Sequence, residues 1–250
     1  MPQPHNNNGQ YYDYVYDQTY GEYYHQLTAS HLSAIDAIVA NHECKSFIDY
    51  GAGTGRITIP LLQRGLRGCA VEPSIMMLNQ LDQKLHNENL NNVCDRYNTT
   101  IRDYINHHNH KSADLALVLF TVFAYITNYD ELEESIKVIS ESLNQGGHLY
   151  FGLEGQGAFN SSAVNMPTLQ RTVTVTRDQN DQTLYNYNEK AQGTFNEVPF
   201  NYNEQFQIRN WDFATIQGYL NKYGLFRSDN PNVEGFQAGA NYYLFKKSQR

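Results

Sequence analysis

The stretch Phe47-Ile-Asp-Tyr-Gly-Ala-Gly-Thr-Gly55 decides the fold, and Arg56 follows it directly. Its apolar start, ending in Asp49, predicts a buried strand. The three glycines, spaced two apart, let the backbone turn tightly and approach a ligand without Cβ atoms in the way. A helix over 56–63 should follow the turn. The free N–H groups and the positive dipole end of this helix would favour a carboxylate or phosphate over the turn.

A second apolar stretch, Gly68-Cys-Ala-Val-Glu72, places Glu72 at the end of the next strand. A carboxylate at that point can accept hydrogen bonds from two ribose hydroxyls. Strand, glycine turn, helix, strand and acid together predict a nucleotide-binding unit. Dinucleotide-binding dehydrogenases use Gly-x-Gly-x-x-Gly, usually after an apolar residue rather than an Asp, so the spacing disfavours a nicotinamide oxidoreductase.

The segment Asp49-Tyr-Gly-Ala-Gly-Thr-Gly-Arg56 resembles the first motif of class I S-adenosylmethionine-dependent methyltransferases. This resemblance implies that Asp49 engages the methionine amino group, often through water, and that Glu72 holds the ribose. It also implies S-adenosylmethionine as the cofactor.

The segment after the second strand, Glu72-Pro-Ser-Ile-Met-Met77-Leu, is similar to the family's Asp-x-Ser-x-x-Met-Leu. Pro73 and Met77 would then pack on the adenine or ribose, although Met77 as plain helix core is an alternative. Thr99 and Thr100 stand where the family commonly offers an Asp to the adenine amino group. The cofactor-binding residues expected from these matches are Tyr20, Asp49, Gly51, Ala52, Gly53, Thr54, Gly55, Arg56, Glu72, Pro73, Met77, Thr99, Thr100, Leu119, Phe120 and Thr121.

The end of the fourth strand, Leu119-Phe-Thr-Val-Phe-Ala-Tyr125, indicates the subclass. It resembles the Phe-Ser-Ser-Ile-Gly-Tyr or His segment of small-molecule methyltransferases, including sugar amine and glycine N-methyltransferases. It is neither Asn-Pro-Pro-Tyr nor Asp-Pro-Pro-Tyr, and the chain has no Pro-Cys dipeptide, so methylation of DNA bases or of glutamine is disfavoured. The resemblance implies that Phe120 and Thr121 lie close to the transferred methyl group, with Tyr125 slightly further out.

Residues 11–24 are crowded with tyrosines and acids. They could form a half-buried flap that packs on the sheet edge with its hydroxyls in water. Alternatively, Tyr16, Asp17 and Tyr20 resemble the Tyr-Asp segment upstream of the first motif in small-molecule methyltransferases, where it closes the cofactor pocket. We favour this lid, and aromatic faces there would suit a cationic or sugar-like acceptor.

Methyl transfer needs an acceptor lone pair placed against the methyl group, and positioning alone can supply much of the acceleration. An amine acceptor needs only to be neutral, whereas a hydroxyl acceptor benefits from a His or Tyr that removes its proton. The candidate catalytic residues are Tyr16, Tyr125 and His25. The histidines at 107–110 precede the fourth strand, at the edge of the sheet opposite the ligand, and are expected in a solvated loop.

Charge and composition limit the partners. The formal net charge is -8, and Lys and Arg do not cluster, which argues against nucleic acid as a substrate. The longest apolar run, 115–126, is too short to span a bilayer, and the amino terminus shows no secretory pattern. The three cysteines are widely spaced without a C-x-x-C pair, so we expect no disulfide framework, no metal site and a cytoplasmic location.

Alternating strand and helix signals predict an α/β fold, a doubly wound, seven-stranded, mostly parallel sheet. The expected strands are 46–50, 69–71, 92–97, 113–120, 148–153, 224–227 and 242–245, and the other helices are 27–41, 74–86, 130–143 and 213–223. Period-two alternation at 172–176, 184–187 and 200–208 predicts an antiparallel insertion after the fifth strand. The chain is expected to begin with a disordered tail (1–10) and a tyrosine-rich lid that ends at residue 26. A methyltransferase domain should follow (27–155 and 210–250), interrupted by an inserted cap (156–209) that binds the substrate or forms a dimer interface.

The leading hypothesis is an S-adenosylmethionine-dependent methyltransferase that acts on an amine or hydroxyl of a small molecule. One alternative is a cofactor-binding module with an assembly role, using the inserted strands to form a homodimer or hold a partner. Another is a protein or peptide methyltransferase, since a lid does not reveal the size of its acceptor.

Overall fold

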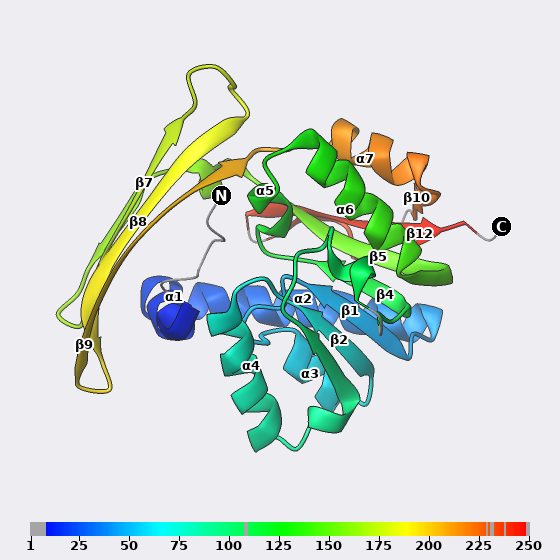
Figure 1. The fold of residues 1–250 in the computed structure, drawn as a ribbon, viewed down its shortest axis with the longest axis horizontal. Coiled ribbons are helices and arrows are strands. Elements are labelled where there is room, and N and C mark those ends of the chain that lie inside the picture. Colours follow the sequence, from blue (N-terminus) through cyan, green and yellow to red (C-terminus); the bar gives the residue numbers. More distant parts are fainter. Residues whose placement is uncertain (1–8, 108–109, 229, 231–232, 238, 249–250) are drawn as a thin grey trace.

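A central sheet covered by helices on both faces forms the body of the molecule, and a second sheet stands beside it (Figure 1). This computed structural model describes residues 9–107, 110–228, 230, 233–237 and 239–248. The doubly wound α/β fold with an antiparallel insertion after the fifth strand is confirmed.

The central sheet has the strand order β10-β12-β5-β4-β1-β2-β3, and β11 pairs with β12. Its parallel strands are β1 (Ser46–Tyr50), β2 (Arg67–Val71), β3 (Cys94–Tyr97), β4 (Ala113–Val118) and β5 (Leu143–Glu154). At its other edge are β10 (Leu225–Arg227), β11 (Gly235–Gln237) and β12 (Ala240–Lys247), and β12 runs antiparallel to β5 and β10. The central strand β4 is almost wholly buried, as an uninterrupted apolar run predicts.

Two apolar cores fill the space between this sheet and its helices. On one face pack α2 (Glu22–His42), α3 (Thr58–Gln63) and α4 (Ile75–Asn87). On the other pack α6 (Tyr129–Glu141) and α7 (Phe213–Lys222). The predicted cap Ser74 accepts the Met77 N–H at the start of α4, and Asp212 accepts the Thr215 N–H at the start of α7.

Several element bounds differ from the expectation. The helix expected from residue 56 begins at Thr58. Strand β4 ends at Val118 rather than at residue 120, and the left-handed backbone angles at Phe120 and Thr121 are incompatible with a strand. The strand expected over 148–153 is the longer β5. The tyrosine-rich segment forms α1 (Tyr12–Tyr20) and runs on into α2.

Short helical turns complete the chain: η1 (Gly9–Tyr11), η2 (Asn91–Val93), η3 (Tyr104–Asn106), α5 (Val122–Tyr125) and η4 (Gln156–Phe159). The first of these lies where we expected disorder over residues 1–10, while residues 1–8 lie outside the described residues.

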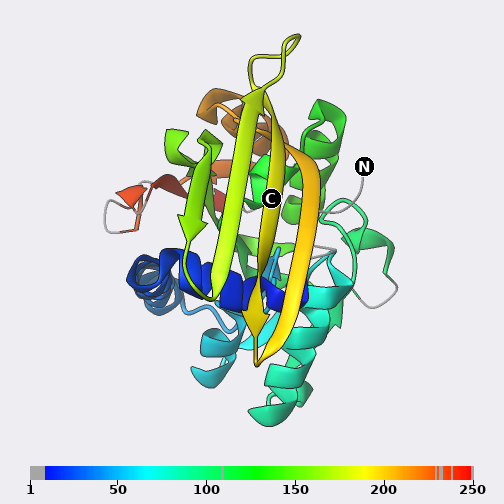
Figure 2. The same cartoon turned by 90° about the vertical axis from the view of Figure 1, so that its left-hand side faces the viewer.

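The second sheet is a fully antiparallel meander. It consists of β6 (Ser162–Asn165), β7 (Leu169–Arg177), β8 (Leu184–Phe195) and β9 (Val198–Arg209), in that spatial order. Figure 2 shows this sheet face-on, with α1 crossing behind it. The helix is held between the two sheets, since Val15 packs in one cluster with Leu169, Ala191, Phe200 and Tyr202. We call the face of this sheet toward α1 its inner face.

Within the described part of the chain, no helix is long and apolar enough to cross a membrane. The same residues contain no group of three or more His, Cys, Asp or Glu side chains arranged to hold a metal ion. All three cysteines are buried and free.

Candidate active site

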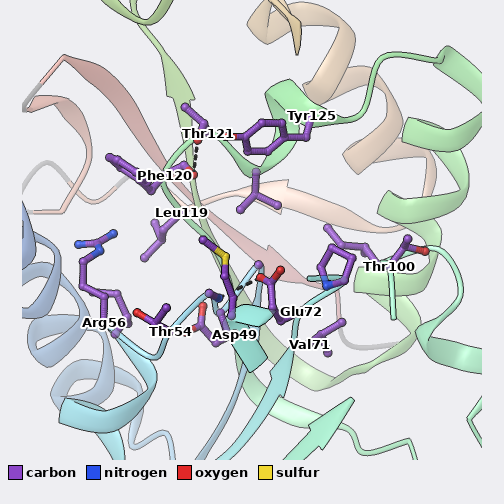
Figure 3. Close-up of a pocket in the computed structure, with 18 of the residues that line it drawn as sticks. Asp49, Thr54, Arg56, Val71, Glu72, Thr100, Leu119, Phe120, Thr121 and Tyr125 are labelled. Carbon is purple, nitrogen blue, oxygen red and sulfur yellow. Dashed lines mark hydrogen bonds between the residues drawn. The ribbon is translucent and has the colours of Figure 1, made fainter. Parts of the chain in front are cut away.

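A cavity opens at the carboxyl ends of β1, β2 and β4, where ligands bind in doubly wound sheets. Figure 3 shows side chains from these strand ends converging on it.

The glycine turn forms the floor of the cavity. Gly51 has φ +74°, and a Cβ there would lie 2.4 Å from the Val122 side chain. Only glycine at this position therefore allows α5, which follows β4, to approach the turn so closely. Gly53 has φ +56°, and a Cβ on it would meet nothing closer than the Met77 sulfur at 3.9 Å. The backbone at Gly53 is therefore open to a ligand.

Two buried carboxylates flank this turn (Figure 3). Glu72 accepts the Gly53 N–H at 2.9 Å and the Ser74 N–H at 2.8 Å. Burial raises the pKa of Glu72 to about 7, against the lowering effect of these two N–H groups. Asp49 accepts the Thr58 hydroxyl at 2.6 Å, and burial raises its pKa to about 6. Each carboxylate keeps lone pairs that can accept from a ligand's amino or hydroxyl groups.

Arg56 is the only Lys or Arg among the described residues that line the cavity. Its guanidinium donates to the Thr28 hydroxyl and to His31 Nδ1, both at 3.2 Å. His31 is fully buried, and its Nε2 lies 2.6 Å from the Tyr242 hydroxyl. Burial, reinforced by the Arg56 charge, lowers the pKa of His31 to about 3, so the imidazole is neutral and can accept from the guanidinium. This chain of contacts fixes a cation at the cavity wall.

The turn after β4 is strained. Phe120 and Thr121 have φ of 61° and 63°, a conformation that typically costs about 1–3 kcal/mol for residues other than glycine. The Thr121 N–H donates to Glu154 at 2.7 Å, which helps hold the turn. This strain directs Phe120, Thr121 and Tyr125 into the same end of the cavity (Figure 3).

The amino-terminal helix α1 closes the cavity from the side of the second sheet. Asp13 accepts the Thr54 hydroxyl at 2.6 Å and forms an ion pair with Lys84, which ties α1 to the glycine turn and to α4. Tyr12 lines the cavity from α1, and Tyr24 lines it from α2. The tyrosine-rich segment therefore covers this side of the cavity, and its action as a lid stays a prediction.

Most expected cofactor residues line this cavity: Asp49, Gly51, Ala52, Gly53, Thr54, Arg56, Glu72, Pro73, Met77, Thr99, Thr100, Leu119, Phe120 and Thr121. Gly55 and Tyr20 do not line it. A Cβ on Gly55 would lie 2.5 Å from the Leu81 side chain, so this glycine serves the packing of α4. Tyr20 points toward the second sheet and accepts from Arg171 at 3.2 Å.

The three candidate catalytic residues do not lie together in the structure. Tyr125 lines the cavity, whereas Tyr16 stacks on Tyr12 with ring centroids 4.2 Å apart and lies one layer behind it. Burial raises the pKa of both Tyr16 and Tyr125 well above the usual value, so neither phenol supplies an anionic base. His25 does not line the cavity; its exposed side chain contacts Asp17 at 3.0 Å.

Sequence reasoning missed a further group of lining residues, which are Tyr12, Tyr24, Ile57, Val71, Ile101, Val122, Ile126, Glu131 and Ser135. Some of these residues, such as Ile57, Val71 and Val122, are sequence neighbours of predicted residues and lie at the same strand ends. Glu131 and Ser135 lie in the first turns of α6, and the rule that helices begin at the carboxyl edge of the sheet could have identified them. Of the histidines at 107–110, His107 packs edge-on against Tyr97 away from the cavity lining, and His108 lies outside the described residues.

Comparison with known proteins shows what the chain resembles. Residues 48–149 match the family model described as "Methyltransferase domain". A solved S-adenosylmethionine-dependent methyltransferase from Clostridium acetobutylicum ATCC 824 is 19% identical, with a TM-score of 0.79 over 95% of this chain and 98% of that one. No curated protein matches the sequence significantly.

Two further solved structures are similar in fold. DesVI from Streptomyces venezuelae is 15% identical, with a TM-score of 0.74 over 95% of this chain and 97% of that one. The sugar N-methyltransferase KedS8 from Streptoalloteichus sp ATCC 53650 is 14% identical, with a TM-score of 0.73 over 95% of this chain and 93% of that one. Residues 48–149 thus match a methyltransferase domain model, and the chain shares the fold of solved S-adenosylmethionine-dependent methyltransferases.

The cavity fits S-adenosylmethionine, the methyl donor of the methyltransferases whose fold the chain shares. S-adenosylmethionine carries a ribose diol, an amino group, a carboxylate and a planar adenine, and the cavity offers a complement to each. Glu72 and Asp49 can accept from the hydroxyl and amino groups, Arg56 can pair with the carboxylate, and the backbone at Gly53 is open to the ligand. Apolar side chains beside Glu72, including Val71 and Ile101, leave room for a flat ring.

Proposed function

We propose that this enzyme transfers a methyl group from S-adenosylmethionine to an amine or hydroxyl of a small molecule. The observation that carries the proposal is the cavity in which Asp49, Glu72 and Arg56 surround an open glycine turn. When bound, S-adenosylmethionine supplies an electrophilic methyl group, which the acceptor's lone pair takes up while the C–S bond breaks and its electron pair stays on sulfur. The similarity in fold to KedS8, a sugar N-methyltransferase, supports a small acceptor.

The enzyme's own contribution is binding and orientation. No histidine occurs among the described residues that line the cavity, and the buried Tyr125 keeps its proton. Catalysis would then rest on holding the acceptor atom against the methyl group in a closed site. A neutral amine, which is a nucleophile without deprotonation, suits such a site better than an alcohol does.

Calorimetry with S-adenosylhomocysteine tests the donor site. We expect wild type to bind it, Gly53→Arg to abolish binding because the side chain would fill the open face, and Glu72→Ala to weaken it strongly. Gly157→Arg is the matched control, since Gly157 is exposed and a Cβ there meets nothing within 4 Å. Absence of binding to wild type would refute the proposal, and unchanged affinity in both site variants would refute the residue assignment.

A panel of small amines, alcohols and phenols, with S-adenosylhomocysteine formation as the readout, tests the acceptor. Turnover of peptides but of no small molecule would instead favour a protein methyltransferase.

A further inference from the structure

Two polar side chains of α6, Glu131 and Ser135, line the cavity. They are four residues apart in the helix, so they lie on the same face, one turn from each other. Beside them, Leu132 and Ile136 pack in the core with Ile101, which also lines the cavity. This face of α6 therefore reaches the cavity next to an apolar wall that suits a flat ring.

This part of the cavity lies beyond Glu72, on the side away from Arg56. Glu72 directly follows β2, and β2 lies between β1 and β3 in the sheet. Thr100 and Ile101 follow β3, and in Figure 3 Glu72 lies between Arg56 and Thr100. A ligand whose carboxylate pairs with Arg56 and whose ribose bonds to Glu72 thus places its base next to Ile101 and α6.

Three carboxylates line the cavity in the described part of the chain, and they belong to Asp49, Glu72 and Glu131. Neighbouring hydroxyl and N–H groups donate to the first two. The half-buried side chain of Glu131 accepts no hydrogen bond from the described residues and forms no ion pair with them. Its two oxygens are thus available to N–H groups of a ligand.

Arg102 lies near Glu131 but is paired with other carboxylates. Its Nε is 3.3 Å from Asp103 Oδ1 and 3.8 Å from Glu134 Oε2. Asp103 raises the pKa of Arg102 through a hydrogen bond and through its charge, and the charge of Glu131 adds to this effect. Since Arg102 follows Thr100 closely in the chain, this interaction places Glu131 at the same end of the cavity as Thr100.

Thr100, which we expected at the adenine amino group, has its hydroxyl engaged in a turn. The hydroxyl donates to the Asp103 carboxylate at 2.8 Å and accepts from the Asp103 N–H at 3.2 Å. This reciprocal pair leaves the Thr100 oxygen a single lone pair for a ligand. A hydrogen bond to a neutral hydroxyl is roughly half as strong as one to a carboxylate, so Glu131 is the better acceptor at this end of the cavity.

We propose that Glu131 and Ser135 bind the base of the methyl donor and select adenine, through its amino group, against purines that carry a carbonyl oxygen instead. This inference rests on the proposed function and assigns the base to α6. Adenine offers an amino donor beside ring nitrogens that accept hydrogen bonds. Glu131 accepts from the amino group, and the buried Ser135 hydroxyl donates to a ring nitrogen next to it.

The charge of Glu131 is what rejects hypoxanthine, which carries a carbonyl oxygen where adenine carries the amino group. A carbonyl oxygen that faces a carboxylate leaves two acceptors without a donor between them, and their negative charges repel. A glutamine at this position has no charge and offers an N–H group as well as an oxygen. Glu131→Gln should therefore accept either base.

Calorimetry with S-adenosylhomocysteine and with S-inosylhomocysteine, its hypoxanthine counterpart, tests the proposal. Wild type should bind S-adenosylhomocysteine at least about tenfold more tightly. In Glu131→Gln the two affinities should lie within about threefold of each other, because S-inosylhomocysteine binds more tightly than it does to wild type. Such a gain in affinity cannot result from a poorly folded variant.

Asp130→Asn is the matched control, because Asp130 is an exposed acid in the same first turn of α6 and does not line the cavity. It should leave both affinities unchanged. Equal affinity of wild type for the two ligands, or a preference that survives in Glu131→Gln, would overturn the proposal. Thr99→Val should keep the preference, and its loss there would place the amino group at the turn after β3 and overturn the proposal as well.

Ser135→Ala tests the second contact. It should weaken S-adenosylhomocysteine about fivefold and keep the preference between the two bases, because Glu131 provides that preference. Unchanged affinity in this variant would overturn the contact assigned to Ser135.

The wild-type protein separates the two levels of inference. Failure to bind S-adenosylhomocysteine would overturn the proposed function itself. Binding of S-adenosylhomocysteine and S-inosylhomocysteine with equal affinity would overturn only the assignment of the base to α6.

Discussion

The protonation of Glu72 should control nucleoside binding. Burial raises the pKa of Glu72 to about 7, and only the ionised carboxylate is free to accept from both ribose hydroxyls. With a pKa near 7, about one tenth of the sites are ionised at pH 6 and about nine tenths at pH 8. The Kd for adenosine should therefore be about tenfold higher at pH 6 than at pH 8.

Adenosine is the right probe because it contains the ribose but neither the amino group nor the carboxylate of the methyl donor. Its binding then reports on Glu72 without titration of the ligand or of the contact expected at Asp49. Calorimetry from pH 6 to pH 8 measures the slope, and Glu72→Gln should bind about tenfold more weakly at pH 8 with no slope. A wild-type Kd that is constant over this range would refute the reasoning.

The stability of the ligand-free protein provides an independent check. Its pH dependence should be opposite in sign to that of the affinity for adenosine, because stability falls as the pH rises whereas affinity increases. The folded-state pKa of Glu72 is raised above the unfolded value of 4.5, so the folded protein binds more protons between pH 4.5 and about 7. The contribution of Glu72 to stability is therefore fully present below pH 4.5 and is lost as the pH rises to 7, by about 3 kcal/mol. In Glu72→Gln this part of the pH dependence should disappear from urea unfolding curves.

Two further substitutions test the geometry around the site. Gly51→Ala should lower the free energy of unfolding by about 1–3 kcal/mol, because the backbone there has φ +74° and the new Cβ would lie 2.4 Å from a neighbouring side chain. The control Gly157→Ala should change the free energy of unfolding little, and equal urea midpoints for the two variants would contradict this expectation. His31→Phe removes the acceptor that orients Arg56, so calorimetry should show affinity for S-adenosylhomocysteine falling about tenfold while that for adenosine, which lacks the carboxylate, is kept. Parallel losses for both ligands would mean that His31 acts through general packing.

The lining of the cavity around the glycine turn could be predicted because one contiguous segment contributes most of it. The strand into Asp49, the glycine turn and the acid at Glu72 are each encoded locally, by apolar runs and by backbone freedom. The left-handed angles at Phe120 and Thr121 could not be predicted in this way, because neither residue prefers them. Tertiary contacts such as the N–H of Thr121 on Glu154 hold that turn, and no local pattern reveals them.

The second sheet was recognised from its period-two alternation, but its charges were overlooked. Glu204 alternates with Tyr202 and Phe206 on one face of β9, which is a signal for an inward-facing charge. Similarly, Arg171 alternates with Val173 on β7. Which way that face points depends on the docking of α1 against the sheet, and only the structure shows it.

The two ends of the cavity thus arise in different ways, and this has a consequence for specificity. The end at Gly53 depends on backbone geometry and on a carboxylate fixed by neighbouring N–H groups, so substitutions there should disturb the fold and ligand binding together. The other end is lined by side chains of the segment after β4, among them Phe120 and Tyr125. Because these two side chains contribute no backbone to the glycine turn, we expect that exchanging Tyr125 changes which molecule is methylated while the methyl donor remains bound.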